Sequence, residues 1–177
     1  MLAISNKINK RPLVYFIGLS AKPMCEHLDP DTRTGNIIDQ IILELPSVEF
    51  IKTNLVKTPP VDQNGNLRYP TSAEMYLGWI ELHDEVNRSD PDLLVTLGQQ
   101  VSLFVRSKMG VQPTKPILPS DFSYESYLSQ SQSKILSVHH PSFIYVYHRK
   151  EIDIYIDNVI TSISALLPER CCSGRSR

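Results

Sequence analysis

Short apolar runs alternate along the chain with longer segments in which apolar residues recur every three or four positions. The runs lie at residues 13–19, 50–56, 93–97 and 134–138. Each is rich in aliphatic or aromatic residues and is bounded by turn-forming or polar residues, a pattern that predicts a buried β-strand. We therefore expect four strands, with an amphipathic helix after each of them.

The predicted helices carry recognisable start and stop signals. Thr34 or Asn36 is expected to cap the first helix, which Pro46 ends. Thr71, with Glu74 three residues later, makes a capping box at the start of the second helix. The predicted helices span residues 37–45, 72–86, 99–108 and 151–167.

Regular alternation of strand and helix predicts an α/β fold of three αβα layers around a four-stranded, mainly parallel sheet. The long stretch at residues 110–133, before the last strand, is expected to be a loop. A chain of 177 residues suits one domain with a full-sized core. We place this domain at residues 1–168 and expect residues 169–177 to form a flexible C-terminal tail.

Composition and charge exclude several classes of protein. Hydrophobic residues make up 41% and charged residues 21% of the chain, as in ordinary soluble domains. No apolar run approaches the length of a membrane span and no signal-peptide pattern is present, so we expect a cytoplasmic protein with no membrane partner. The net charge of −1 argues against a broad basic coat for nucleic acid but allows a local basic patch. We expect a monomer.

The cysteine pattern predicts neither a metal site nor an iron–sulfur cluster. The three cysteines are Cys25, Cys171 and Cys172, of which two are adjacent, and no pair has the spacing typical of metal ligands. We therefore expect free thiols, no metal and no other cofactor.

Special residues follow or end each predicted strand. The segments are 18–23 (Gly-Leu-Ser-Ala-Lys-Pro), 53–60 (Thr-Asn-Leu-Val-Lys-Thr-Pro-Pro), 96–98 (Thr-Leu-Gly) and 139–142 (His-His-Pro-Ser). Ligands of open α/β sheets bind beyond the carboxyl ends of the strands. These four segments therefore predict a single site.

Taken in order, the same segments resemble the motifs of the uracil-DNA glycosylase superfamily. The likeness extends over about residues 13–165 and includes residues 35–39 (Gly-Asn-Ile-Ile-Asp) and 91–98. Residues 53–60 are most similar to branches that carry iron–sulfur clusters, and residues 140–142 match the His-Pro-Ser motif. The resemblance implies a glycosylase fold and cofactor-free hydrolysis of the N-glycosidic bond of uracil or another altered pyrimidine in DNA, which leaves an abasic site.

The resemblance also implies roles for residues of the predicted site. His140 would stabilise the leaving base, Ser20 would position water, and Gly18 and Leu19 would border the base. An asparagine amide can pair with both a carbonyl and the imide N–H of a pyrimidine, so Asn54 is the candidate that distinguishes uracil from cytosine. The alternative for Asn54 is a turn residue that satisfies backbone groups.

DNA contacts are expected on both sides of the flipped nucleotide. Ser142 would hold a flanking phosphate, and an apolar tip of Phe143, Ile144 and Tyr145 would wedge into the duplex. For Phe143 and Ile144 the alternative is core packing. The cations expected to neutralise the backbone are Lys22, Lys57 and Arg149, for each of which a solvated surface position is the alternative.

The first motif departs from the active branches of the family. Neither Leu19 nor Ser20 is the carboxylate or amide found there, Ala21 replaces a proline, and cluster-ligating cysteines are missing, which fits a cluster-free branch. No stacking aromatic is identifiable in residues 24–34. Three hypotheses follow: a glycosylase for uracil-type bases, one for bulkier modified bases of foreign phage DNA, and a non-catalytic DNA-binding module. An unrelated nucleotide-binding protein lacks support, because no phosphate-binding glycine loop is present.

Overall fold

A five-stranded sheet forms the middle layer of the computed structural model, which describes residues 10–25, 27–111 and 118–168. The strand order is β2-β1-β3-β5-β4. The strands are β1 (Leu13–Ser20), β2 (Glu49–Val56), β3 (Leu93–Leu97), β4 (Ser126–Leu128) and β5 (Lys134–Val138). All neighbours pair in parallel except β4, which runs antiparallel to β5.

The prediction of four strands was therefore wrong by one, and the sheet is mixed. The additional strand, β4, lies within the stretch that we expected to be a long loop. Its three residues pair with β5 through Ser126–Leu136 and Leu128–Lys134, at the edge of the sheet. Ser126 and Leu128 are exposed, so this strand contributes no apolar run that periodicity could detect.

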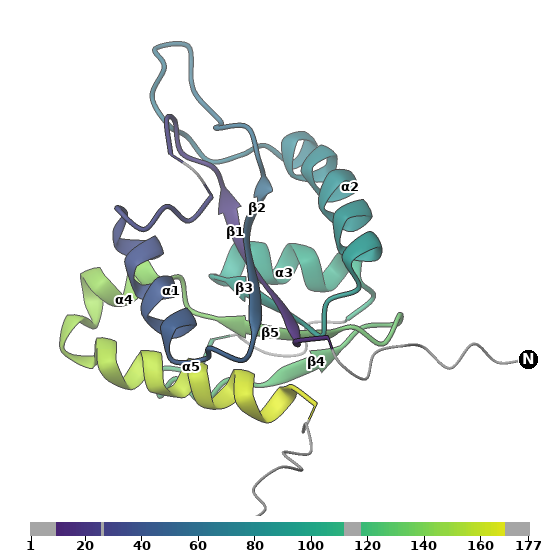
Figure 1. Cartoon of the computed structure of the whole chain (residues 1–177). Coiled ribbons are helices and arrows are strands. Elements are labelled where there is room, and N and C mark those ends of the chain that lie inside the picture. Colours follow the sequence, from purple (N-terminus) through teal and green to yellow (C-terminus); the bar gives the residue numbers. More distant parts are fainter. Residues whose placement is uncertain (1–9, 26, 112–117, 169–177) are drawn as a thin grey trace, which may run out of the picture.

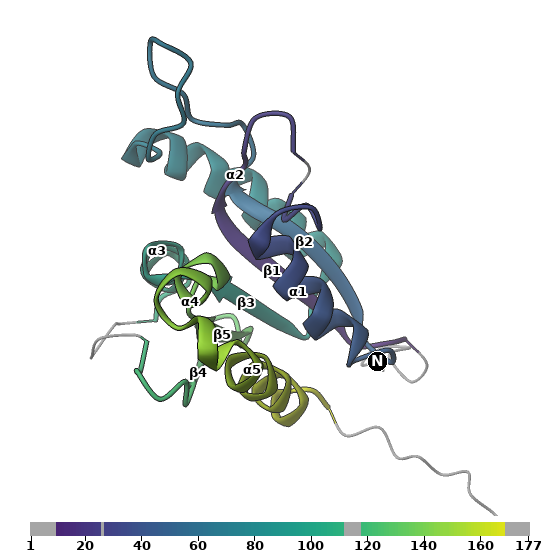
Figure 2. The same ribbon diagram turned by 90° about the vertical axis from the view of Figure 1, so that its left-hand side faces the viewer.

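Five helices cover the two faces of the sheet (Figures 1 and 2). One face packs on α1 (Arg33–Leu43), α4 (Pro141–Tyr147) and α5 (Ile152–Leu166), and the other on α2 (Ser72–Ser89) and α3 (Gln99–Lys108). Alternate side chains of β1 contribute to the two cores on opposite faces of the sheet. Val14 and Phe16 join the first core and Tyr15 and Ile17 the second, because successive side chains of a strand point to opposite faces.

The helix starts show where local signals succeeded and where they failed. The capping box of Thr71 and Glu74 at α2 is confirmed. Helix α1, however, begins earlier than expected, because the cap is Thr32, whose hydroxyl accepts the Gly35 N–H at 3.0 Å. Helix α4 was not predicted at all, and the short 3₁₀ turn Arg149–Glu151 links it to α5.

Within the described residues, no helix is both long enough and apolar enough to cross a membrane. Cys25 is a free thiol. The predicted tail at residues 169–177, with the other two cysteines, lies outside the described part of the chain.

Candidate active site

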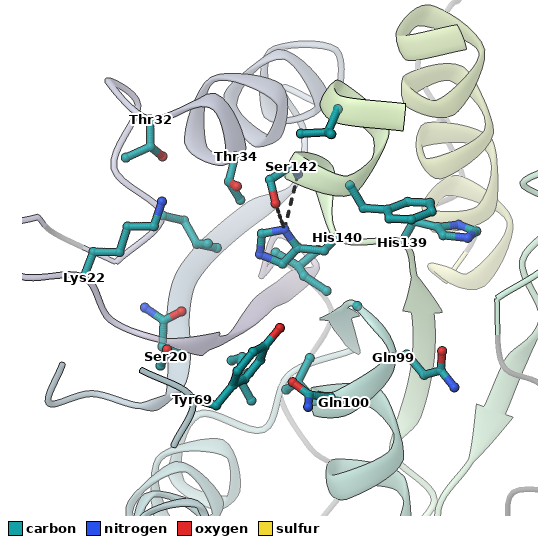
Figure 3. Close-up of a pocket in the computed structure, with 18 of the residues that line it drawn as sticks. Ser20, Lys22, Thr32, Thr34, Tyr69, Gln99, Gln100, His139, His140 and Ser142 are labelled. Atoms are coloured by element: carbon teal, nitrogen blue, oxygen red, sulfur yellow. Dashed lines mark hydrogen bonds between the residues drawn. The ribbon is translucent and has the colours of Figure 1, made fainter. Parts of the chain in front are cut away.

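A pocket of about 860 Å³ opens at the edge of the sheet where the four parallel strands end. It gathers residues from all four strand ends, as the sequence predicts for open α/β sheets. These residues are Leu19, Ser20, Asn54, Leu97, Gly98, His139 and His140. Figure 3 shows several of them around the cavity.

His140 is held in one tautomer by the start of α4. It is the N-cap of that helix, and its Nδ1 accepts the backbone N–H of Ser142 at 3.2 Å. Nδ1 also lies 2.7 Å from the Ser142 hydroxyl. Because a nitrogen that accepts an N–H cannot carry a proton, the proton of the neutral ring lies on Nε2. The free N–H of His140 is thus available on the pocket side (Figure 3).

Burial keeps His140 neutral. Desolvation first, and the positive charge of Lys22 second, lower the pKa of His140 from 6.5 to about 4. Close packing against the turn after β3 contributes, since a Cβ on Gly98 would lie 3.1 Å from the Cβ of His140. Gly98 has a φ of +93°, so the turn requires glycine for its backbone as well.

Asn54 lies on β2 with only 3% of its surface exposed. Its Nδ2 is 2.8 Å from Nδ1 of His27, and its Oδ1 lies against Gly18, where an added Cβ would come within 2.3 Å. This bond to a side chain differs from the backbone bonds expected of a turn asparagine. Gly18 thus supports the amide without lining the pocket, and His27 orients it.

The residues of the first motif lie on the pocket wall without a carboxylate. Leu19 and Ser20 are half-buried there, and Lys22 is exposed at the rim. Among the described residues that line the pocket, the one carboxylate belongs to Asp29, in the loop before α1. One of its oxygens accepts the Asp31 N–H at 2.9 Å.

Tyr69 forms a wall that sequence reasoning missed. It is 74% exposed, yet it lines the pocket, and Figure 3 shows its ring pointing toward His140. Its backbone is tied to the start of α2, because the Arg68 guanidinium donates to the Tyr69 carbonyl and to both carboxylate oxygens of Glu74. The side chains of Gln99 and Gln100 lie at the same pocket from the first turn of α3, and they too were not predicted.

His139 belongs to an aromatic cluster rather than to the chemistry of the pocket. Its Nδ1 lies 2.9 Å from the Tyr124 hydroxyl, and its ring stacks on Phe143 with centroids 5.5 Å apart. Figure 3 shows its ring directed away from that of His140. Burial, followed by the nearby His148, lowers the pKa of His139.

The expected DNA-contact residues are distributed unevenly. Phe143, which is 40% exposed, and Ser142 line the pocket. Ile144 does not belong to an exposed apolar tip. It is fully buried, because the helical turn of α4 directs it into the core, which was the alternative for this residue. Lys57 pairs with Glu85 at 2.6 Å and does not line the pocket.

No group of three or more His, Cys, Asp or Glu side chains is arranged to hold a metal ion in the described parts of the chain.

The family model described as the uracil DNA glycosylase superfamily matches residues 9–162, which span both faces of the sheet and the whole pocket. No curated protein matches the chain.

Proposed function

Because the chain belongs to the uracil DNA glycosylase superfamily, we propose that it is a monofunctional DNA glycosylase acting on uracil or another altered pyrimidine. It would hydrolyse the N-glycosidic bond of a flipped nucleotide and leave an abasic site. The observation that carries this proposal is the neutral His140, whose Nε2–H faces the pocket at the ends of the parallel strands.

His140 supports the departure of the base. When the bond between C1′ and the base nitrogen breaks, its electron pair stays on the base and negative charge develops at O2. A neutral N–H donor fixed in a poorly solvated pocket stabilises this charge in the manner of an oxyanion hole. Water then forms the new bond to C1′, and the proton that it loses balances the charge of the departing base.

Asn54 supports recognition of a uracil-like base. Its Oδ1 can accept the imide N–H, and the amide hydrogen not given to His27 can donate to the neighbouring carbonyl. Cytosine presents the opposite pattern of donor and acceptor at these positions. A desolvated amide that is left mispaired weakens binding strongly, so the pair of Asn54 and His27 rejects cytosine.

The first motif favours a slow rate of base excision. Ser20 can orient a water by hydrogen bonding but supplies no charge to stabilise the sugar cation. Asp29 is the one negative charge among the described lining residues, and we assign electrostatic stabilisation of the cation to it.

A second substrate class is favoured by the size of the pocket. Its volume of about 860 Å³ lies near the upper end of the range for small-molecule sites, and Ser20 places only a small side chain on its wall. A pyrimidine with a bulky substituent at its 5-position, as in modified foreign DNA, is the second candidate.

Single- and double-stranded oligonucleotides that carry one uracil, one bulky 5-substituted pyrimidine or only normal bases test the proposal. Alkali cleaves the strand wherever a base has been released. Cleavage at uracil supports the first substrate class, and cleavage at the bulky base alone supports the second. Binding without cleavage of any oligonucleotide would contradict the glycosylase and favour a non-catalytic DNA-binding module.

A further inference from the structure

A second pocket, of about 640 Å³, lies beside the base pocket, and Thr32 lines both. The start of α1 forms one wall, and the corner between α4 and α5 forms the other. Unlike the base pocket, this one is lined by several charged side chains. They are Asp31, Arg33, Arg149, Lys150 and Asp153.

Two arginines in this pocket share one aromatic ring. The guanidinium carbon of Arg33 lies 4.5 Å from the ring centroid of Tyr145, and that of Arg149 lies 5.0 Å from it. Tyr145 is half-buried between α1 and α5, so the ring is a fixed platform for both groups. We call these three residues the arginine clamp.

The clamp pocket has an excess of positive charge, because its described lining carries three cations, Arg33, Arg149 and Lys150, and the two carboxylates of Asp31 and Asp153. Within the described residues neither Arg33 nor Arg149 forms an ion pair, although Arg68 elsewhere makes a two-pronged pair with Glu74. The two charges lie less than 10 Å apart because both contact the same ring. An anion with several oxygens relieves this repulsion and matches the planar donor geometry of guanidinium groups.

The donors of Ser142, by contrast, are already engaged. Its backbone N–H donates to Nδ1 of His140, and its hydroxyl lies at hydrogen-bond distance from the same atom. The residue that the His-Pro-Ser motif offers for a flanking phosphate therefore serves to fix the histidine. Affinity for the DNA backbone must come from other groups.

Helix α4 sets the distance between the two pockets. His140 caps its start and Tyr145 lies in its last turn, so the two residues are separated by a rise of about 7.5 Å along the helix axis at 1.5 Å per residue. Successive nucleotides of one strand rise by about 3.4 Å along a duplex. A rise of this size corresponds to about two nucleotide steps along the strand.

We propose that the arginine clamp binds a backbone phosphate about two nucleotides away from the flipped base. This proposal rests on the function proposed above. Arg33 and Tyr145 would then take part in DNA binding, which the sequence motifs do not indicate, and the ligand of Arg149 would be this phosphate. The base pocket selects the nucleotide, and the clamp anchors the strand.

The test measures binding to a duplex with a stable abasic analogue, which the enzyme cannot cleave. The variants are Arg33→Gln, Arg149→Gln and both together, with Arg88→Gln on the exposed side of α2 as the matched control. We expect about threefold weaker binding for each single variant and about tenfold for the double variant. The slope of log affinity against log salt should become shallower by about 1 in the double variant, as expected for one lost phosphate contact.

Trimming the duplex locates the phosphate. Removing nucleotides one at a time from each end should lower wild-type affinity in one step close to the abasic site, and this step should be missing in the double variant. At saturating uracil DNA the double variant should keep the wild-type rate, with only KM raised.

An unchanged salt slope and trimming profile in a double variant that melts like the wild type would overturn the clamp, while base excision by the wild type would leave the proposed function intact. A wild-type protein that neither binds nor cleaves DNA would overturn both.

Discussion

The two neighbouring pockets differ in how they use charge. The base pocket holds a neutral histidine, amide side chains and apolar walls, with Lys22 and Asp29 as the charged groups among its described lining residues. The clamp pocket is lined by three cations and two carboxylates. An uncharged base is best recognised by desolvated hydrogen bonds, whereas a polyanionic backbone is best held by accessible cations. Changes in the first pocket should therefore alter catalysis and base recognition, and changes in the second should alter salt-dependent binding.

His140→Ala should give the largest effect and separate the two pockets most sharply. Loss of the fixed N–H donor should lower the rate of uracil release by about 10²–10³-fold. Affinity for the abasic duplex and its salt slope should remain within about twofold of wild type, because no phosphate contact is lost. Single-turnover kinetics and fluorescence anisotropy measure the two quantities, with His83→Ala on α2 as the control.

Asn54→Ala should give the next largest effect. Removal of the amide should lower the rate on uracil by about 10–10²-fold, because the imide N–H and carbonyl lose their partners. His27→Ala should keep more activity but raise excision of cytosine relative to uracil, since the amide would be free to turn over. Competition between uracil and cytosine oligonucleotides checks both variants. Equal discrimination in all three proteins would contradict the assignment of Asn54.

Tyr69→Ala should have a moderate effect. The exposed ring lies at the pocket opposite α4, where stacking on a base contributes about 1 kcal/mol or more. We expect KM for uracil DNA to rise about five- to tenfold, and Tyr69→Phe to restore it, because stacking needs the ring and not the hydroxyl. Tyr76→Ala, on α2 outside the pocket, is the matched control. Failure of Tyr69→Phe to restore binding would exclude stacking as the role.

Lys22→Gln should give the smallest effect. Lys22 is the second cause of the lowered pKa of His140, so its removal should raise that pKa and move the acidic limb of the rate profile to higher pH. Stability has a related dependence. The folded pKa of His140 is lower than the unfolded one, so the unfolded chain takes up the proton first and stability falls as pH drops from 6.5 toward 4. Rate profiles and melting curves of both proteins, recorded across this range, check the two shifts.

Much of the fold was predictable because the pattern along the chain was regular. The strands Leu93–Leu97 and Lys134–Val138 have the predicted bounds, since compact apolar runs reflect burial directly. Strand β4 and helix α4 were missed. Strand β4 has two exposed residues of three. The seven residues of helix α4 include β-branched and aromatic side chains that suit a strand equally well.

Site residues that belong to a sequence motif could be predicted, whereas residues that reach the pocket only through tertiary contacts could not. Ser20, Asn54 and His140 meet at one pocket because parallel strands end at the same edge. His27 and Tyr69 come from loops whose path no periodicity encodes, although each acts beside a motif residue. Arg33 is likewise an unremarkable first-turn residue until the fold places it across from Tyr145.

The most direct test of the account is the pH dependence of uracil release by the wild-type protein under single-turnover conditions. Protonation of His140 would occur at Nδ1 and break its bond from the Ser142 N–H, so only the neutral ring is correctly held. The account predicts release of free uracil at a rate that is constant from neutral pH down to about pH 5 and falls near the pKa of about 4. No release at any pH would contradict the assignment of uracil as the substrate, and an acidic limb near 6.5 in a protein that stays folded would contradict the role of the neutral His140.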